Sequence, residues 1–178
     1  MNKNEILSYY GIIYLTVKNL LIIIKRLNAY LIMKKLIFSI LLLFSITGFS
    51  QDLNWETDFS VAKQRASYEN KPILMYFTGS DWCSPCKQLK VDFFDSQKFI
   101  DKANSFILLK VDLPFRQDII SDEQRKKNKA LSKKYNHSDS FPNIVGLNSR
   151  GKVVNNISAY SSLRDTTLHF NFIESLLN

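Results

Sequence analysis

The chain has 178 residues, of which 46% are apolar and 13% aromatic, which is enough to build a packed core and excludes an intrinsically disordered protein. Its formal charge of +8 suggests a polyanion partner, but six lysines and arginines lie in the first 50 residues with a single glutamate. The remaining residues carry 18 basic and 15 acidic side chains, a net charge of about +3. We therefore expect no nucleic-acid partner.

The segment 33–50 has the order of a secretory signal peptide. Met33 is followed by two lysines, an apolar run over 36–44 and mostly small residues at 48–50. This order predicts cleavage after Ser50. A retained membrane anchor is the alternative, but the apolar run is shorter than the roughly 20 residues that a spanning helix needs.

Residues 1–32 are apolar but are interrupted by Lys18 and Asn19, and they precede a signal that is already complete. We interpret them as a mis-assigned upstream extension, with translation starting at Met33. The alternative is a membrane segment with Lys25 and Arg26 on the cytoplasmic side. In either case the domain 51–178 is expected to be periplasmic or otherwise exported, and anchored to the membrane if the N-terminal segment is retained. Thiols in such compartments tend to be oxidised.

The exported part begins with helix and strand signals in alternation. Trp55, Phe59, Ala62 and Ala66 recur at helical spacing and predict a helix over 55–69. It should end before Pro72, because the residue preceding a proline is pushed out of the helical region. The next elements along the chain are a buried strand at 73–77, a helix at 86–94 and a second buried strand at 106–112.

The C-terminal half continues with a helix and a hairpin. Ser121 and the acidic residues after it predict the start of a helix over 121–136. Strands at 143–148 and 152–158 flank a turn signal, and a last helix is expected over 163–177. Parallel strands joined through helices and closed by one antiparallel hairpin make an α/β domain, in which a mixed central sheet has helices on both faces.

Two cysteines, Cys83 and Cys86, stand in the stretch DWCSPCKQLK. They could be half of a zinc site, a structural staple or a catalytic dithiol. Zinc would need two further ligands, and neither Met nor His gathers nearby to complete a site for a soft metal such as Cu(I). A staple over so short a loop would remove little entropy from the unfolded chain. The catalytic dithiol is therefore favoured.

The motif Trp82-Cys83-Ser84-Pro85-Cys86-Lys87 follows the first buried strand, and Phe141-Pro142 precedes the hairpin. With these motifs residues 52–177 resemble the thioredoxin superfamily, and within it the exported thioredoxin-like domains akin to the C-terminal domain of DsbD. The resemblance implies a thioredoxin fold and a thiol–disulfide oxidoreductase. It also implies no cofactor other than a redox-active disulfide between Cys83 and Cys86.

The residue types in the motif suit disulfide exchange. Cys83 lies where a strand meets a helix, and unpaired N–H groups there stabilise a thiolate, so we expect it to be the attacking residue. Cys86 is its neighbour at i+3 and is expected to resolve the mixed disulfide. Pro85 would stiffen the pair, and Trp82 would shield one side of it.

The resemblance also assigns roles to three residues outside the motif. It implies a cis peptide bond between Phe141 and Pro142, with backbone that pairs with a bound peptide as an added strand. Phe141 replaces the smaller residues common there, which would make the surroundings of the cysteines more apolar. Tyr76 occupies the place of a buried acid that relays protons, and a tyrosine, with a pKa of about 10, is a poor base near neutrality.

Three further features each have two interpretations. His137 could approach the cysteines as a base or be a solvated loop residue. The basic helix face at 125–134 could dock an acidic partner or simply face water. Asp81 could raise the pKa of Cys83 by repulsion between like charges, or hold its loop in place.

We expect the domain to be a monomer that acts on thiols and disulfides of other exported proteins. By analogy with its relatives it would act as a reductase, supplied by a membrane-embedded electron donor. The alternative is a non-catalytic thioredoxin-like module that binds a soft metal or a partner protein.

Overall fold

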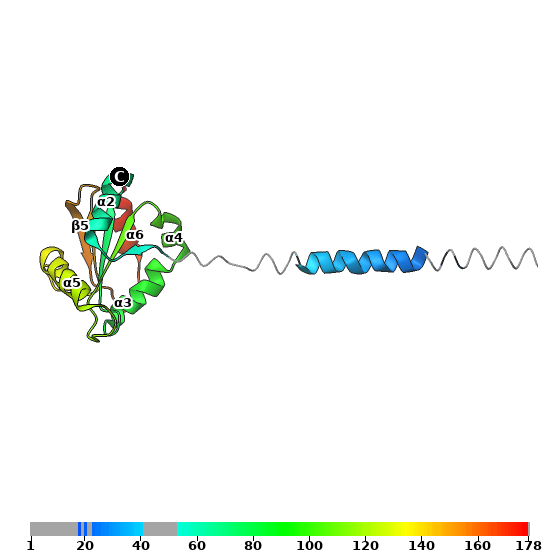
Figure 1. Cartoon of the computed structure of the whole chain (residues 1–178), viewed down its shortest axis with the longest axis horizontal. Coiled ribbons are helices and arrows are strands. Elements are labelled where there is room, and N and C mark those ends of the chain that lie inside the picture. The colour runs from blue at the N-terminus through cyan, green and yellow to red at the C-terminus, as the bar shows by residue number, and fades with distance from the viewer. Residues whose placement is uncertain (1–17, 19, 21–22, 41–52, 178) are drawn as a thin grey trace, which may run out of the picture. The chain divides into compact units, whose positions relative to one another are not determined.

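The computed structural model describes residues 18, 20, 23–40 and 53–177 (Figure 1). The chain divides after Ser50 into two compact units. In the first unit, residues 23–40 are helical. The predicted cleavage point after Ser50 and most of the segment 1–22 lie outside the described residues. Among the helices that are described, none combines the length and the apolar character needed to cross a membrane.

The second unit is built on a mixed sheet, as the sequence predicts, but the sheet has five strands where four are predicted. Its strands are β1 (Trp55–Glu56), β2 (Ile73–Thr78), β3 (Ile107–Asp112), β4 (Asn143–Leu147) and β5 (Val153–Ser158). Their order across the sheet is β1-β3-β2-β4-β5. The pairs β1–β3 and β2–β3 are parallel, whereas β2–β4 and β4–β5 are antiparallel. The sheet and its closing hairpin are therefore confirmed.

The first helix of this unit, α2 (Phe59–Glu69), is shorter than predicted. Asp58 caps it by accepting the N–H of Ser60 at 2.8 Å, so the four residues from Trp55 are not helical. Trp55 and Glu56 instead pair with β3 as the strand β1. The helix ends at Asn70, whose φ of 50° is the left-handed conformation that asparagine tolerates at a C-cap.

The segment after the cysteines differs from the predicted helix 86–94 in two ways. The helix α3 (Ser84–Leu89) begins two residues earlier and continues into the π-helical turn η1 (Lys90–Phe94). A further helix, α4 (Gln97–Ala103), was not predicted. The side chain of Ser96 caps it by accepting the N–H of Phe99, and this cap is the sequence signal that could have identified the helix.

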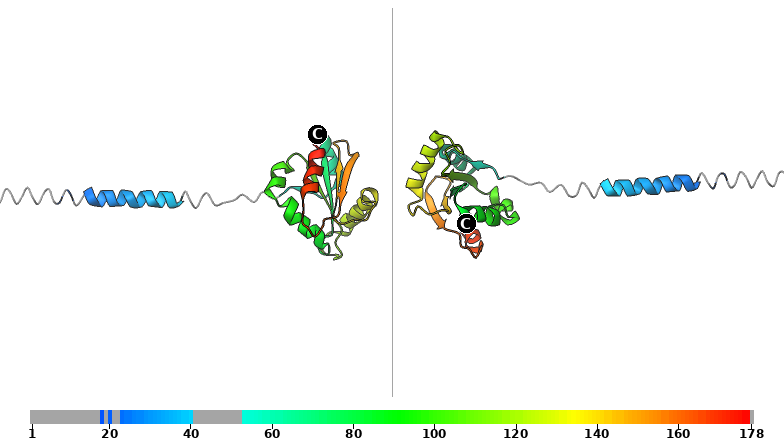
Figure 2. Two further views of the ribbon diagram at one scale, coloured as in Figure 1. Left: turned by 180° about the vertical axis from the view of Figure 1, so that it is seen from behind. Right: turned by 90° about the horizontal axis from the view of Figure 1, so that it is seen from below.

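The last two helices lie where the sequence places them. The helix α5 (Asp122–Tyr135) has the predicted cap at Ser121. The helix α6 (Thr167–Ser175) is shorter at both ends than the predicted 163–177. Figure 2 shows helices on both sides of the sheet from two further directions.

Two cores form on the two faces of the sheet. One is rich in aromatic rings and includes side chains of α3, η1, α4 and α6; we call it the aromatic core. Its buried members are Leu74, Tyr76, Cys83, Cys86, Leu89, Phe93, Phe94, Phe99, Ala103, Phe106, Leu108, Ile144, Tyr160, Phe170, Phe172 and Ile173. The other, the aliphatic core, packs under α2 and α5. Its buried members are Ala62, Ala66, Ile73, Met75, Phe77, Ile107, Leu109, Val111, Val145 and Leu147.

Candidate active site

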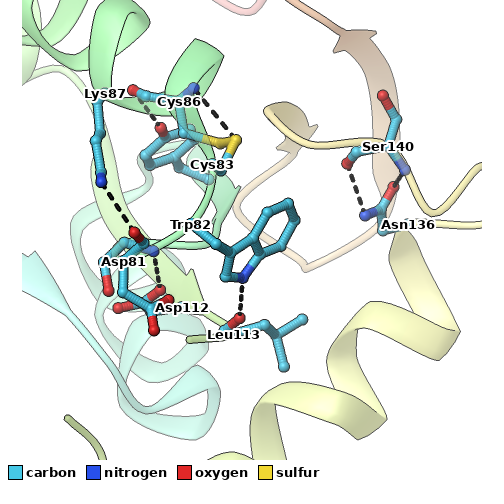
Figure 3. Close-up of a disulfide and its surroundings, with 11 residues drawn as sticks. Asp81, Trp82, Cys83, Cys86, Lys87, Asp112, Leu113, Asn136 and Ser140 are labelled. Carbon is cyan, nitrogen blue, oxygen red and sulfur yellow. Dashed lines mark hydrogen bonds between the residues drawn. A yellow bond between two sulfur atoms is a disulfide. The ribbon is translucent and has the colours of Figure 1, made fainter. Parts of the chain in front are cut away.

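The two cysteines lie just beyond the C-terminal end of β2, at the start of α3. Cys83 is the N-cap of α3, and its sulfur accepts the N–H of Cys86 at 3.2 Å. The backbone N–H of Cys83 donates to Gly79 O at 2.8 Å, which fixes the turn between strand and helix. The two sulfurs form a disulfide, with 5.3 Å between the Cα atoms (Figure 3). The predicted neighbours at i and i+3 are thus bonded to each other.

Both cysteines are buried, each with 2% of its surface exposed. They belong to the aromatic core, and the partly buried Trp82 and Phe141 pack against that core. The pair therefore lies in an apolar setting at a helix N-terminus. Burial destabilises a thiolate there, whereas the helix dipole stabilises it. Pro85 is in the first turn of α3, where its missing N–H costs no hydrogen bond.

Trp82 lies between the cysteine turn and the loop that follows β3. Its indole Nε1 donates to Leu113 O at 2.8 Å, as Figure 3 shows. Its ring stacks on Phe115 with 4.9 Å between centroids, and it meets Phe141 edge-on at 5.3 Å. A Cβ atom at Gly79 would come within 2.2 Å of the indole, so only glycine leaves room for this position of Trp82.

Asp81 holds the same loop, which was one of its two predicted interpretations. Its carboxylate accepts the backbone N–H of Phe115 at 3.0 Å and that of Arg116 at 2.8 Å. Desolvation raises the pKa of Asp81, but these backbone donors outweigh it, and the net pKa lies below the ordinary value. Asp81 is therefore an ionised anchor of the loop.

The peptide bond between Phe141 and Pro142 is cis, as the family resemblance implies. The carbonyl of Pro142, a buried residue, accepts the N–H of Ala159 at 2.8 Å. This places the start of β4 against the end of β5.

A buried amide that was not predicted supports this proline. Asn136 is 1% exposed; its Nδ2 donates to Ser140 O at 3.0 Å, and its Oδ1 accepts Asn143 Nδ2 at 2.9 Å. Asn143 Oδ1 in turn accepts the hydroxyl of Ser158 at 2.9 Å. The network joins the end of α5 to β4 and β5 around Pro142. Each member is an ordinary loop or strand residue in the sequence, so no local signal identifies it.

Tyr76 lies next to the resolving position. Its hydroxyl donates to Cys86 O at 3.1 Å, and burial raises the pKa of Tyr76 to about 12. The phenol therefore stays protonated at every pH at which disulfide exchange is measured. A cavity of about 230 Å³ reaches Cys86 and is lined by Tyr76 and by three lysines, Lys87, Lys90 and Lys110.

The predicted basic face of α5 is divided by its contacts. Arg125 donates to the carbonyls of the loop after β3, and Lys127 pairs with Asp58 at 3.2 Å and with Glu123 at 3.1 Å. Lys129 and Lys133 instead line a surface hollow that reaches Phe141.

His137 is exposed and lines the same hollow. Within the described residues no hydrogen bond links it to either cysteine. In the part of the chain that the structure describes, no group of three or more His, Cys, Asp or Glu side chains is arranged to hold a metal ion.

Comparison with known proteins supports the resemblance found in the sequence. A family model described as thioredoxin-like matches residues 54–148. The disulfide bond reductase DsbH of Chlamydia pneumoniae is 32% identical over 102 residues, which cover 57% of this chain and 60% of that protein. The thioredoxin-related protein DsbJ of the same organism is 27% identical over 135 residues, covering 72% and 38%. The chain thus spans less than two thirds of the length of either relative.

A solved structure titled DsbH oxidoreductase superposes with a TM-score of 0.62 and 26% identity. It covers 72% of this chain and 86% of the other. This similarity confirms the thioredoxin fold expected from the sequence.

Proposed function

The chain belongs to the thioredoxin-like family, and from this premise we propose that it is a thiol–disulfide oxidoreductase whose reacting atoms are the sulfurs of Cys83 and Cys86. One observation carries the proposal. A CSPC pair, close enough to form a disulfide, lies at the N-terminus of α3 in the same apolar site as the Phe141 ring that precedes the cis proline. A structural disulfide would need none of these surroundings.

In the reductive direction Cys83 reacts first. Its thiolate attacks one sulfur of a substrate disulfide; the substrate S–S bond breaks, and the leaving sulfur takes up a proton. The N–H of Cys86, which points at Cys83 Sγ, stabilises the thiolate before attack. Cys86 then loses its proton and attacks Cys83 Sγ. The second substrate thiol leaves, and the Cys83–Cys86 disulfide forms. Two electrons and two protons pass to the substrate.

Because Tyr76 stands where the family resemblance implies a buried acid, no carboxylate at that position can accept the proton of Cys86. A phenol with a pKa of about 12 cannot act as the base. Asp95 also lines the cavity that reaches Cys86, but its carboxylate is paired with Lys90 at 2.7 Å, which favours solvent as the proton acceptor. We therefore propose that the resolving step depends on solvent hydroxide and is faster at higher pH.

We propose reduction as the physiological direction, on exported proteins and with electrons from a membrane-embedded donor. The name of the relative DsbH, a disulfide bond reductase, supports this direction. The signal-like segment 33–50 supports an exported setting. In that setting the disulfide state would accumulate unless a donor reduced it.

The test is reduction of insulin by dithiothreitol, with the wild type compared with Cys83→Ser. We expect the wild type to accelerate the reaction and the variant to add nothing to the uncatalysed rate. Equal rates for the two proteins would overturn the proposal and favour a module that binds without turnover. Titration of the wild-type pair against glutathione then assigns direction, since a potential near about −270 mV fits a reductant and one near about −120 mV an oxidant.

A further inference from the structure

The loop after β3, residues 113–118, presents a phenylalanine to solvent beside the disulfide site. Phe115 is 72% exposed, yet its ring stacks on Trp82 at an interplanar angle of 16°. Trp82 in turn contacts Phe141. The three rings form a continuous aromatic surface, which we call the aromatic ridge. It extends from the residue that precedes Cys83 to the residue that precedes Pro142.

The loop is fixed from three directions, so the exposed ring is not a consequence of a mobile segment. Asp81 accepts the N–H groups of Phe115 and Arg116, and the indole of Trp82 donates to Leu113 O. The guanidinium of Arg125 on α5 donates to Pro114 O and, at 2.8 Å, to Arg116 O. Five backbone groups of this short loop are therefore bound by side chains from elsewhere.

Holding an apolar ring in water costs free energy, because covering it would remove apolar surface from contact with water. A rigid aromatic side chain at the surface is also the kind of residue that dominates binding energy, because little conformational entropy is lost when it is covered. Phe115 thus has the properties of a preformed contact for a partner.

A positively charged hollow continues from the aromatic ridge towards α5. Lys129, Lys133 and His137 line it together with Leu113 and Phe141. Asp139 is its one acidic lining residue. Among the described residues neither Lys129 nor Lys133 has a hydrogen bond or ion pair, whereas Lys127 on the same helix has two acidic partners. The free ammonium groups therefore favour a negatively charged group in this hollow.

We propose that the aromatic ridge and this hollow together dock an extended segment of a partner protein. The segment carries a large apolar side chain close to its reactive cysteine and an acidic side chain further along. The apolar side chain covers Phe115, and the acidic one pairs with Lys129 and Lys133. This inference rests on the proposed function and adds a substrate preference to it.

The experiment uses peptides whose single cysteine carries a 2-hydroxyethyl disulfide, turned over with dithiothreitol. One peptide has Phe close to the cysteine and Glu further along. The other two peptides replace either the Phe by Ser or the Glu by Gln. For the wild type we expect kcat/KM to favour the Phe peptide by about tenfold and the Glu peptide by about threefold. Phe115→Ser should abolish the first preference, and the double variant Lys129→Gln/Lys133→Gln the second.

Matched controls separate the surface from general effects. Tyr68→Ser removes a more exposed aromatic ring from α2, and Lys126→Gln/Lys134→Gln removes the same charge from another part of α5. Both should keep the two preferences. If the wild type does not distinguish the peptides, or if Phe115→Ser distinguishes them as the wild type does, the docking proposal is wrong. The neutral bis(2-hydroxyethyl) disulfide separates the proposals, since failure of the wild type to exceed Cys83→Ser on it would refute the redox function itself.

Discussion

The two faces of the sheet are packed in different ways, although the same strands supply both. On β2, Leu74 and Tyr76 enter the aromatic core, whereas Ile73, Met75 and Phe77 enter the aliphatic core. This is the alternation expected of a strand that is buried on both sides. The two cysteines belong to the aromatic side only.

On the aromatic side, large rings fill the space and fix one another. The ring of Phe93, for example, has four ring contacts at centroid distances between 4.8 and 5.5 Å, with Phe94, Phe99, Phe170 and His169. On the aliphatic side, Ala62 and Ala66 are fully buried and let α2 lie close to the sheet. The disulfide is thus set in the side that depends on large rings, whereas on the opposite side the approach of α2 to the sheet depends on two small residues, Ala62 and Ala66. Loss of side-chain volume should therefore damage the aromatic side, and a gain of volume should damage the contact between α2 and the sheet.

The largest effect is expected from removal of a ring in the aromatic core. Phe93→Ala should lower the free energy of unfolding by about 3–5 kcal/mol, since it leaves a cavity among several rings. Urea denaturation of the reduced protein measures this. Phe93→Leu is the conservative control and should cost less. A loss below about 1 kcal/mol for the alanine variant would mean that the rings repack and that the contrast between the two sides is weaker than stated.

A gain of volume is the corresponding test of the aliphatic core. Ala66→Leu should lower the free energy of unfolding by about 1–3 kcal/mol, because a buried alanine that packs a helix on a sheet leaves no room for more atoms. Ser67→Leu puts the same side chain at the next, exposed position of α2 and should have little effect. If both variants are equally stable, α2 is not closely packed.

Loss of the Tyr76 hydroxyl should have a smaller effect. Tyr76→Phe removes the hydrogen bond to Cys86 O and should cost about 1 kcal/mol of stability. The pH profile of insulin reduction between pH 6 and 9 should keep its shape, because the pKa of Tyr76 is raised to about 12, far above this range. Loss of the alkaline rise in this variant would instead show that the phenol takes part in proton transfer.

The buried His169 should make the aromatic side sensitive to pH. Burial lowers the pKa of His169 below its ordinary value of 6.5, and this outweighs the nearby carboxylate of Asp165, which raises it. Above about pH 6.5 the imidazole is neutral in both states, and stability is unaffected. As the pH falls below 6.5 the unfolded state binds the proton first, so stability falls until the pH reaches the folded-state pKa.

Urea midpoints between pH 7.5 and 5 test this effect. His169→Phe should flatten the slope in this range, whereas His137→Gln, at the exposed histidine, should leave it as in the wild type. An unchanged slope in His169→Phe would assign the pH dependence to other groups.

The features predicted from the sequence are those with short-range signals. The candidate active-site motif spans four residues and contains Cys83, Pro85 and Cys86. The buried strands and the hairpin are indicated by apolar runs that flank turn residues. The cis bond at Pro142 followed from the resemblance and was found.

Apart from α4, whose Ser96 cap is a local signal, the features missed depend on contacts between distant segments. The sequence left two interpretations of Asp81, and its contact with Arg116, 35 residues away, decides between them; Trp82 binds Leu113, 31 residues away. Trp55 fits the apolar period of a helix, but pairing with β3 makes it a strand. The spacing of apolar residues within a segment does not indicate which other segment it will pack against. The position of the loop that carries Phe115 and the pairing of the short strand β1 could therefore be seen only in the structure.

The order of attack at the two sulfurs is the central claim, and trapping tests it most directly. Reduced Cys86→Ser, mixed with a disulfide-containing peptide, should accumulate a covalent adduct on Cys83 that mass spectrometry detects and dithiothreitol reverses. Reduced Cys83→Ser should form far less adduct under the same conditions, since its remaining thiol, Cys86, is not at the N-cap of α3 and lacks the backbone N–H that Cys83 Sγ accepts. Equal adduct yields in the two variants, or no adduct in Cys86→Ser, would contradict the assignment of Cys83 as the attacking thiol.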